Sequence, residues 1–184
     1  MKKNTGTKRI KTENLLLRKM HFFDYFEFVK WFRDESVTRF SRGKAKNTRY
    51  DTFRFLLQRI YNYYIKRRNN YYFWCISKNG KMIGYINAYK LEGDGRFWLM
   101  YMVSPAEQSK GYATEAVKAV LEYMKTQNSK VVFGACDTDN IASYRVLEKA
   151  GMTYINHTEN VFHYRDGRVG SQELFGMKMN EENI

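Results

Sequence analysis

Apolar side chains recur with the spacing of one helical face around residues 24–33, 50–67 and 112–128. Each of these segments predicts an amphipathic helix that packs through its apolar face. Asp24 takes the N-cap position of the first helix, and Arg54, Arg59 and Lys66 turn outward in the second. The predicted apolar faces are Phe22, Tyr25, Phe26, Val29 and Phe32; then Phe53, Leu56, Leu57, Ile60, Tyr61 and Tyr64; then Ala113, Ala116, Val117, Val120, Leu121 and Met124.

Strand-forming segments and turn signals fill most of the remaining chain. Strands are predicted over residues 14–19, 71–77, 81–90, 97–103, 130–136, 152–163 and 168–179. Asn79-Gly80 and Asp166-Gly167 are hairpin signals, a basic loop covers 41–49, and a short helix over 141–150 ends at Gly151. The helix between strands 97–103 and 130–136 forms a crossover, so these two strands should be parallel in an otherwise antiparallel sheet. We expect one α+β domain over residues 1–184, with residues 1–12 as a flexible basic N-terminus.

Composition narrows the class of protein. The length of 184 residues suits one domain, and 43% hydrophobic residues supply a core, which excludes general disorder. No apolar run approaches the ~20 residues needed to cross a bilayer, and the basic N-terminus leads into no apolar signal region. These features predict a cytoplasmic protein without membrane contact. Cys75 and Cys136 are expected to be buried free thiols rather than a disulfide framework.

The positive charge is concentrated at one end of the chain. Residues 1–70 hold 19 Lys and Arg against 6 Asp and Glu, whereas residues 71–184 hold 13 of each. The whole net charge of +13 therefore lies in the first 70 residues. Such an asymmetry favours a surface that binds a partner, and a solvated charged face is the alternative interpretation.

Residues 101–116 join a strand end, a proline and a short loop that opens directly into a helix. A helix N-terminus leaves backbone N–H groups unpaired and carries about half a positive charge, which suits a phosphate. Small residues at Ser109, Gly111 and Ala113 allow a pyrophosphate to approach the backbone, while Thr114 adds a hydroxyl and Lys110 a charge. An ordinary strand-to-helix turn is the alternative, because a single glycine is a weak signal.

Two motifs give this loop a more specific meaning. Gln108-x-x-Gly111-x-Ala113 resembles the acetyl-CoA pyrophosphate loop of the GCN5-related N-acetyltransferase (GNAT) superfamily. The segment from Asn140 to Gly151 resembles the second cofactor motif of that superfamily. Glu13–Arg18 and the Asp166-Gly167 hairpin resemble the branch that acetylates alanine or serine N-termini of ribosomal proteins. The resemblance covers nearly the whole chain and implies a mixed, mostly antiparallel sheet of about six or seven strands with helices on both faces.

The resemblance also implies roles for individual residues, with acetyl-CoA as the acetyl donor. Backbone groups of Tyr101, Met102 and Val103 would bind pantetheine and polarise the thioester carbonyl. Asn140 would bond the pantetheine arm, and Ser143 would lie near the sulfur as the candidate catalytic acid. The residues implied to cradle the pyrophosphate are Gln108, Ser109, Lys110, Gly111, Tyr112, Ala113 and Thr114. From the residues alone, Asn140 also suits a helix N-cap and Ser143 a small packing residue.

Two positions depart from the family pattern. Ser109 stands where glycine is common, which we expect to be tolerated if its φ stays negative. Leu147 stands where many members carry a tyrosine that protonates the leaving thiolate. Ser143 or a bound water is therefore the expected substitute, and Tyr144 lies one turn away.

The strand over residues 97–103 contains no carboxylate or histidine to act as a general base. A peptide α-amine, with a pKa of ~7.7–8, is partly neutral near pH 7, whereas a lysine at ~10.4 is almost entirely protonated. A site without a strong base therefore favours an N-terminal α-amine as acceptor. A water chain to Glu92 or Glu173 is the alternative route for the proton.

These observations predict an acetyltransferase in which an amine attacks acetyl-CoA directly within a ternary complex. The alternatives are a small-amine acetyltransferase, acting on an antibiotic or polyamine, and a non-catalytic RNA- or ribosome-binding module with Lys, Arg and Tyr interleaved over residues 39–72. His21, His157 and His163 lack metal-ligand spacing with the cysteines, so no metal site is predicted, and the last two are expected on a hairpin surface. The residues expected to recruit an acidic acceptor, or an RNA surface beside it, are Arg42, Lys44, Lys46, Arg49, Lys66, Arg67 and Arg68.

Overall fold

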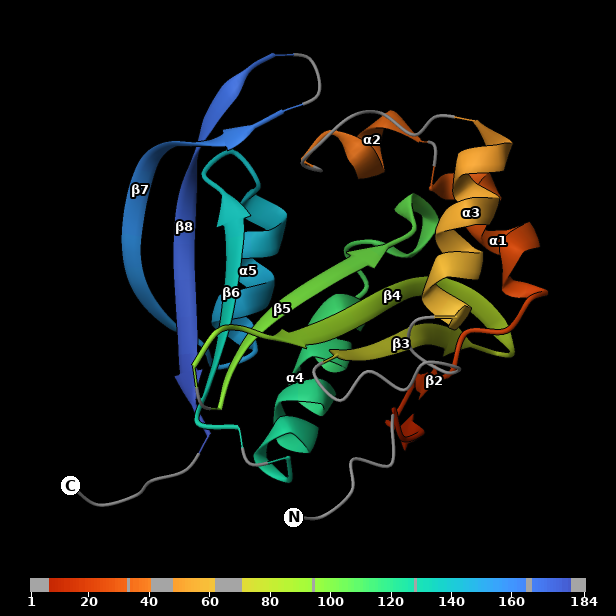
Figure 1. Cartoon of the computed structure of the whole chain (residues 1–184), viewed down its shortest axis with the longest axis horizontal. Coiled ribbons are helices and arrows are strands. Elements are labelled where there is room, and N and C mark those ends of the chain that lie inside the picture. Colours follow the sequence, from red (N-terminus) through yellow and green to blue (C-terminus); the bar gives the residue numbers. More distant parts are fainter. Residues whose placement is uncertain are drawn as a thin grey trace.

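One sheet carries the fold, with its eight strands in the order β1-β2-β3-β4-β5-β6-β8-β7 (Figure 1). The computed structural model describes residues 7–32, 34–40, 48–61, 71–93, 95–127, 129–164 and 167–179. The strands are β1 (Ile10–Lys11), β2 (Leu16–Arg18), β3 (Tyr71–Lys78), β4 (Lys81–Lys90), β5 (Arg96–Val103), β6 (Val131–Asp137), β7 (Thr153–His163) and β8 (Val169–Lys178). All pairs are antiparallel except β5 with β6, which is parallel as the crossover predicts. The strand missing from the sequence prediction is β1, because two residues are too few to form a pattern.

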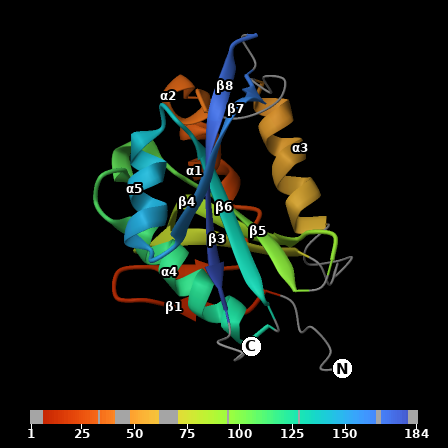
Figure 2. The same ribbon diagram turned by 90° about the vertical axis from the view of Figure 1, so that its left-hand side faces the viewer.

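Helices cover both faces of the sheet, as predicted (Figure 2). Helices α1 (Asp24–Trp31) and α3 (Arg49–Ile60) pack on one face, and α4 (Tyr112–Lys125) and α5 (Ile141–Lys149) pack on the other. Because both faces are covered, β3 is buried along most of its length. Its Tyr72, Trp74 and Ile76 join the core under α4, whereas Phe73 and Cys75 join the core under α1. The buried residues of α4 are Ala116, Val117, Val120, Leu121 and Met124, all from its predicted apolar face.

The buried face of α1 differs from the predicted one. Phe28 and Trp31 are buried, whereas Phe22 and Phe26 are 49% and 57% exposed. Aromatic residues occur on every side of this helix, so the periodicity does not single out one face. The position of the sheet decides which rings are covered.

Asp24 is the first residue of α1 and not its N-cap, which is Phe23. Its carboxylate accepts two hydrogen bonds from Arg18, at 2.7 and 2.8 Å, and one from the backbone N of His21 at 2.7 Å. The predicted cap therefore forms a largely buried ion pair that fastens α1 to β2. A single buried pair of this kind positions the helix rather than adding much stability.

The apolar face of α3 is also rotated from the prediction. Leu56 is fully buried, but Leu57 and Tyr61 are 41% and 48% exposed. Arg59, predicted to turn outward, lies over the ring of Phe55 at 4.4 Å from its centroid. The predicted helical residues 62–67, with Tyr64 and Lys66, lie outside the described part of the chain.

A further short helix lies between α1 and α3. The short helix α2 (Glu35–Thr38) was not expected, because four residues are too few for a periodicity.

The N-terminal segment is bonded to β3. The side chain of Thr7 accepts a hydrogen bond from Phe73 N at 3.2 Å, and Lys8 O accepts one from Trp74 Nε1 at 2.7 Å. Part of the segment expected to be a flexible N-terminus is therefore tied to β3. Residues 1–6 and the loop residues 41–47 lie outside the described ranges.

Candidate active site

The parallel strands β5 and β6 separate halfway along their length. Their paired register runs from Arg96 opposite Val131 to Leu99 opposite Gly134 and then stops, although both strands continue. Figure 1 shows the two strands diverging toward their C-terminal ends. Backbone groups on the facing edges beyond Leu99 therefore lack the partners that a continuous sheet provides.

The backbone N–H and C=O groups of successive β5 residues point alternately toward β4 and toward this gap. Ser104 N donates to Ile83 O at 2.8 Å and Leu91 N donates to Arg96 O at 2.9 Å, so even-numbered residues of β5 face β4. Because the β4–β5 register is uninterrupted, the amides and carbonyls of Tyr101 and Val103 face the gap. The backbone groups of Met102 face β4 instead, which corrects the expectation that all three residues present theirs to a ligand.

The loop after β5 carries the predicted phosphate-binding residues. A short 3-10 helix over Pro105–Glu107 leads to Gly111, the N-cap of α4, which has a φ of +83° and no side-chain cap. Gln108 Nε2 donates to Val103 O at 3.2 Å and folds the loop back on the strand end. The first helical hydrogen bond joins Glu115 N to Gly111 O, so the amides of Tyr112, Ala113 and Thr114 have no helical acceptor. A Cβ added at Gly111 would meet open space, which leaves room for a bound group.

Ser109 has a φ of +59°, so the condition under which serine would replace glycine without strain, a negative φ, is not met. The backbone here is left-handed, the conformation for which glycine is favoured, and the serine bears the associated strain. The neighbouring Lys110 forms an ion pair with Glu107 at 3.2 Å and is half exposed. The hydroxyl of Tyr112 accepts a hydrogen bond from Lys78, whose ammonium also lies 3.8 Å from the carboxylate of Glu107 in the loop.

Glu115, in the first turn of α4, is held away from the helix N-terminus. Its Oε1 accepts from Thr12 Oγ1 at 2.6 Å and from Asn14 N at 2.8 Å, and its Oε2 accepts from Asn14 Nδ2 at 3.1 Å. Burial alone would raise the pKa of Glu115, but these hydrogen bonds together outweigh it and lower the pKa. The carboxylate therefore stays charged and fastens the segment before β2 to α4.

The second predicted motif lies at the start of α5, on the other side of the gap. Asn140 is its N-cap, with Oδ1 accepting from Ser143 N at 3.1 Å, so the N-cap interpretation is confirmed. The capping bond uses Oδ1 and leaves the Nδ2 donor for another group. The carbonyl oxygen of Ser143 accepts from Tyr101 Oη at 3.1 Å, which places Ser143 beside the diverging end of β5.

The two other residues considered for the acid role face elsewhere. Leu147 is fully buried in the core under α4 and α5. Tyr144 packs edge-on against Phe175 of β8 at 5.0 Å, and its ring is tilted against that of Tyr154 of β7 at 6.5 Å. It also lines a cavity of about 390 Å³ on the outer side of α5, away from β5.

Of the two carboxylates considered as general bases, Glu92 lies beyond the far end of β5 and Glu173 is bonded to neighbouring side chains. Glu92 precedes β5, and the seven residue steps of that strand, at ~3.3 Å each, separate it from Val103 by roughly 20 Å. Glu173 Oε1 contacts His157 Nδ1 at 2.8 Å and accepts from Thr138 Oγ1 at 3.2 Å. His157 lies on the β7–β8 hairpin and is exposed, as expected.

One further carboxylate, Asp137, was missed by the sequence analysis although it directly follows an apolar strand whose end borders the gap. It is 3% exposed, and its Oδ1 accepts from Asp139 N at 2.7 Å. Its Oδ2 is enclosed beside Gly170 and Tyr164 and has no hydrogen-bond partner of normal geometry among the described residues. Burial and the adjacent Asp137 raise the pKa of Tyr164.

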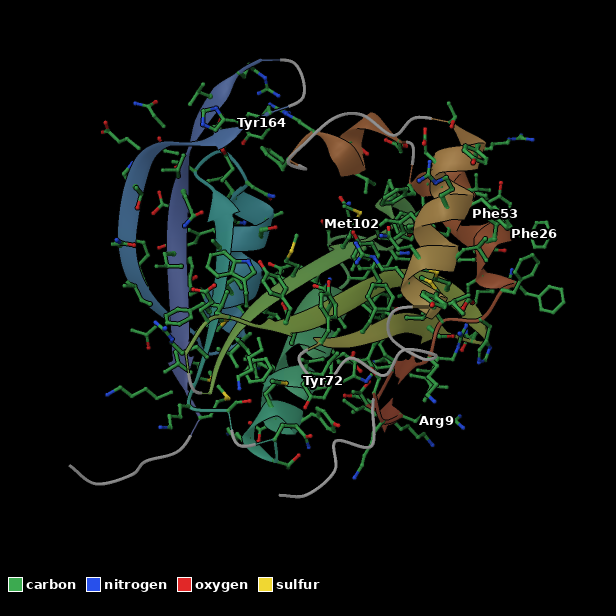
Figure 3. The ribbon with its side chains drawn as sticks, in the orientation of Figure 1. Arg9, Phe26, Phe53, Tyr72, Met102 and Tyr164 are labelled. Atoms are coloured by element: carbon green, nitrogen blue, oxygen red, sulfur yellow. The ribbon has the colours of Figure 1, made fainter. Side chains whose placement is uncertain are left out.

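The face of the gap opposite α5 is bordered by residues from three segments. The side chains of Met100 and Met102 lie on the α1–α3 side of β5, and Met100 is half exposed. Phe40, after α2, makes an edge contact at 6.5 Å with Tyr164 on the β7–β8 hairpin. Figure 3 shows Met102 at the end of β5 and Tyr164 on the hairpin.

The cysteines and metal ligands give no further chemistry. Cys75 and Cys136 are buried and free, as predicted, and burial raises the pKa of Cys136 to about 12. The described residues contain no group of three or more His, Cys, Asp or Glu side chains that could hold a metal ion. None of the helices in the described ranges is long and apolar enough to cross a membrane.

Comparison with known proteins identifies the family of this chain. The family model "Acetyltransferase (GNAT) domain" matches residues 14–153. The uncharacterized N-acetyltransferase YnaD of Bacillus subtilis is 32% identical over 145 residues, which cover 78% of this chain and 81% of that protein. This chain belongs to the GNAT acetyltransferases. It is an acyltransferase, and acetyl-CoA is its acetyl donor.

Solved structures agree with the GNAT fold. A GNAT-family acetyltransferase from Bacillus anthracis has a TM-score of 0.82 at 24% identity and covers 95% of this chain and all of its own. The ribosomal-protein-S5-alanine acetyltransferase of Vibrio fischeri has a TM-score of 0.79 at 16% identity, covering 96% of this chain and all of its own. At these identities the likeness shows the fold, and the acceptor has to be argued from the site.

Proposed function

We propose that this GNAT acetyltransferase transfers the acetyl group to the N-terminal α-amine of a peptide or protein. The observation that carries the proposal is that β5 holds no carboxylate or histidine, while Glu92 lies beyond the far end of β5 and Glu173 contacts His157 at 2.8 Å. An α-amine with a pKa of ~7.7–8 needs far less help to lose its proton than a lysine at ~10.4.

The proposed cofactor site uses the residues on the α4–α5 side of the gap. The backbone of Tyr101 and Val103 would bond the pantetheine arm, with Asn140 Nδ2 as a further donor. Residues 108–114 would receive the pyrophosphate, because Tyr112, Ala113 and Thr114 present amides without helical acceptors. Lys110 would add charge from the edge of the loop. This arrangement leaves the α1–α3 side of the gap for the acceptor.

The proposed reaction is direct attack of the amine within a ternary complex. The amine nitrogen forms the new N–C bond at the thioester carbonyl, the C–S bond breaks, and the nitrogen loses its proton to solvent. The N–H groups of β5 that face the gap would stabilise the oxyanion. Ser143 would supply a proton to the leaving thiolate. An acetyl-cysteine intermediate is disfavoured, because both thiols are buried and stay protonated.

An amine panel tests the acceptor class. The panel contains a lysine-free peptide with a free N-terminus, the same peptide N-acetylated and carrying one lysine, a polyamine and an aminoglycoside. We expect CoA release and a mass gain of one acetyl group with the first peptide, at a rate that rises with pH through ~8. Turnover of the polyamine or aminoglycoside alone would make the protein a small-amine acetyltransferase.

We further propose that the positive N-terminal region recruits an acidic acceptor or an RNA surface beside it. Arg49 begins α3, on the acceptor side of the sheet. Arg42, Lys44, Lys46, Lys66, Arg67 and Arg68 lie outside the described residues. Neutralising Lys44, Lys46 and Arg49 together should raise KM for the acceptor and leave KM for acetyl-CoA unchanged. An equal change in both values would indicate a folding defect instead.

A further inference from the structure

Five aromatic rings form a connected cluster on the outside of α1 and α3, far from the β5–β6 gap. Phe22 contacts Phe23 and Phe53, and Tyr25 contacts Phe26 and Phe53, with centroids 5.6 to 6.1 Å apart. We call these five residues the aromatic patch. Figure 3 shows Phe26 and Phe53 at the outer edge of the molecule.

The aromatic patch is exposed, and α1 and α3 pack on the sheet through other residues. Phe23 is 77% exposed, Phe26 57% and Phe22 49%, and Tyr50 next to the patch on α3 is 66% exposed. The two helices already bury other residues, such as Phe28 and Leu56, against the sheet. Contiguous exposed rings of this kind mark an interaction surface more often than a solvated face.

The charge around the patch indicates an anionic partner. Helix α3 carries Arg49, Arg54 and Arg59 against one acidic residue, Asp51. Within the patch region, Asp24 is paired with Arg18 and Glu27 with Lys30. The guanidinium of Arg54 lies over the ring of Tyr50, 5.7 Å from its centroid. A second copy of the chain would bring the same positive surface against this one and be repelled.

The ring geometry favours nucleic acid bases over an apolar surface. The rings of the patch meet at interplanar angles of 70° to 88°, so their faces point in several directions rather than forming one flat sheet. Separate bases of an unpaired strand can each stack on a ring face, while arginines contact the phosphates. We propose that the aromatic patch, with Tyr50, Arg49 and Arg54, binds single-stranded RNA. This proposal stands whatever amine the enzyme acetylates.

Binding of a fluorescent single-stranded RNA, followed by anisotropy without acetyl-CoA, tests the proposal. The double variant Phe23→Ala/Phe26→Ala removes two exposed rings, and we expect about tenfold or greater weakening because each stacked base contributes strongly. The matched control is Ile155→Ala/Val169→Ala, which removes two half-exposed apolar side chains from β7 and β8 and should bind as wild type. Arg49→Gln/Arg54→Gln should reduce the slope of log affinity against log salt by about 1.4, the value for two phosphate contacts on a single strand.

Three outcomes would overturn the proposal. One is equal affinity of wild type and Phe23→Ala/Phe26→Ala, which removes the patch from RNA binding. Another is a loss of the same size in the Ile155→Ala/Val169→Ala control. The third is binding to anionic phospholipid vesicles with no measurable RNA binding, which would make the patch a membrane contact. Retention of the thermal shift caused by acetyl-CoA in every variant shows that the domain is folded.

Discussion

The phenolic oxygen of Tyr101, at the diverging end of β5, donates a 3.1 Å hydrogen bond to the backbone carbonyl oxygen of Ser143 in α5. The bond joins two residues 42 positions apart in sequence and links the end of β5 to the second predicted cofactor motif. Burial raises the pKa of Tyr101, so the hydroxyl keeps its proton and remains a donor at neutral pH. Tyr101 thus sets the distance between the strand end and the helix that border the proposed cofactor site.

Replacing Tyr101 with phenylalanine should weaken acetyl-CoA binding. The variant loses one buried hydrogen bond, so we expect a stability loss of about 1 kcal/mol in chemical denaturation. We also expect a higher Kd for acetyl-CoA by calorimetry, because the hydrogen bond that holds the end of β5 to α5 is lost. Tyr72→Phe is the matched control, since it loses the 3.2 Å bond to Gln127 away from the gap. It should lose similar stability with an unchanged Kd.

Gly111→Ala should abolish most of the thermal stabilisation by acetyl-CoA. The added Cβ enters the open space before α4, where the proposed site receives the pyrophosphate, and stabilisation by a ligand follows its affinity. Gly167→Ala is the control for backbone strain, because Gly167 also has a positive φ, of +85°, and open space around it. Both variants should melt lower than wild type, but only Gly111→Ala should lose the ligand shift. An undiminished shift in Gly111→Ala would falsify the pyrophosphate assignment.

Ser109→Gly should stabilise the protein by about 0.5–1 kcal/mol. Glycine adopts the left-handed conformation of residue 109 without the strain of a Cβ, and the gain is partly offset by the greater freedom of glycine in the unfolded chain. Ser109→Ala keeps the Cβ and should show no such gain. Denaturant unfolding of the two variants separates backbone strain from the loss of the hydroxyl.

Ser143→Ala should lower kcat by about 10²-fold with little change in the Kd for acetyl-CoA. The hydroxyl of Tyr101 donates to the backbone carbonyl oxygen of Ser143, so the substitution keeps the hydrogen bond between β5 and α5. Steady-state kinetics with the accepted amine, together with calorimetry, measure the two effects. A normal kcat would remove Ser143 from the mechanism and leave water as the proton donor.

Glu115→Gln should destabilise the protein at pH 7 and matter less in acid. Because the folded pKa of Glu115 is lowered, its contribution is complete above the unfolded value of ~4.3 and is lost as the pH falls through the folded pKa. We expect a difference of about 1 kcal/mol at pH 7, discounted for partial exposure. Denaturation curves at pH 7 and pH 3 should show the difference shrinking. A constant difference at both pH values would argue against the charged hydrogen bonds to Thr12 and Asn14.

The sequence by itself determined the elements and the cofactor motifs, because these depend on neighbouring residues. The Asn79-Gly80 turn shows the positive φ values of its hairpin type at both positions, 48° and 80°. The apolar spacing of α4 gives its buried face, since its five buried residues all fall on the one stripe that the spacing predicts. The helix between strands 97–103 and 130–136 carries the chain back along the sheet, so the second strand starts at the same end as the first and pairs with it in parallel.

Only the tertiary structure decided which surfaces are covered and where the strands part. In α1, aromatic residues occur all around the helix, so contact with the sheet selects Phe28 and Trp31 and leaves Phe26 outside. The separation of β5 from β6 after Leu99 depends on packing between segments far apart in sequence, as does the enclosure of Asp137 by Gly170 and Tyr164. A local pattern records the spacing of apolar residues but not the partner that buries them, and long-range contacts supply that partner.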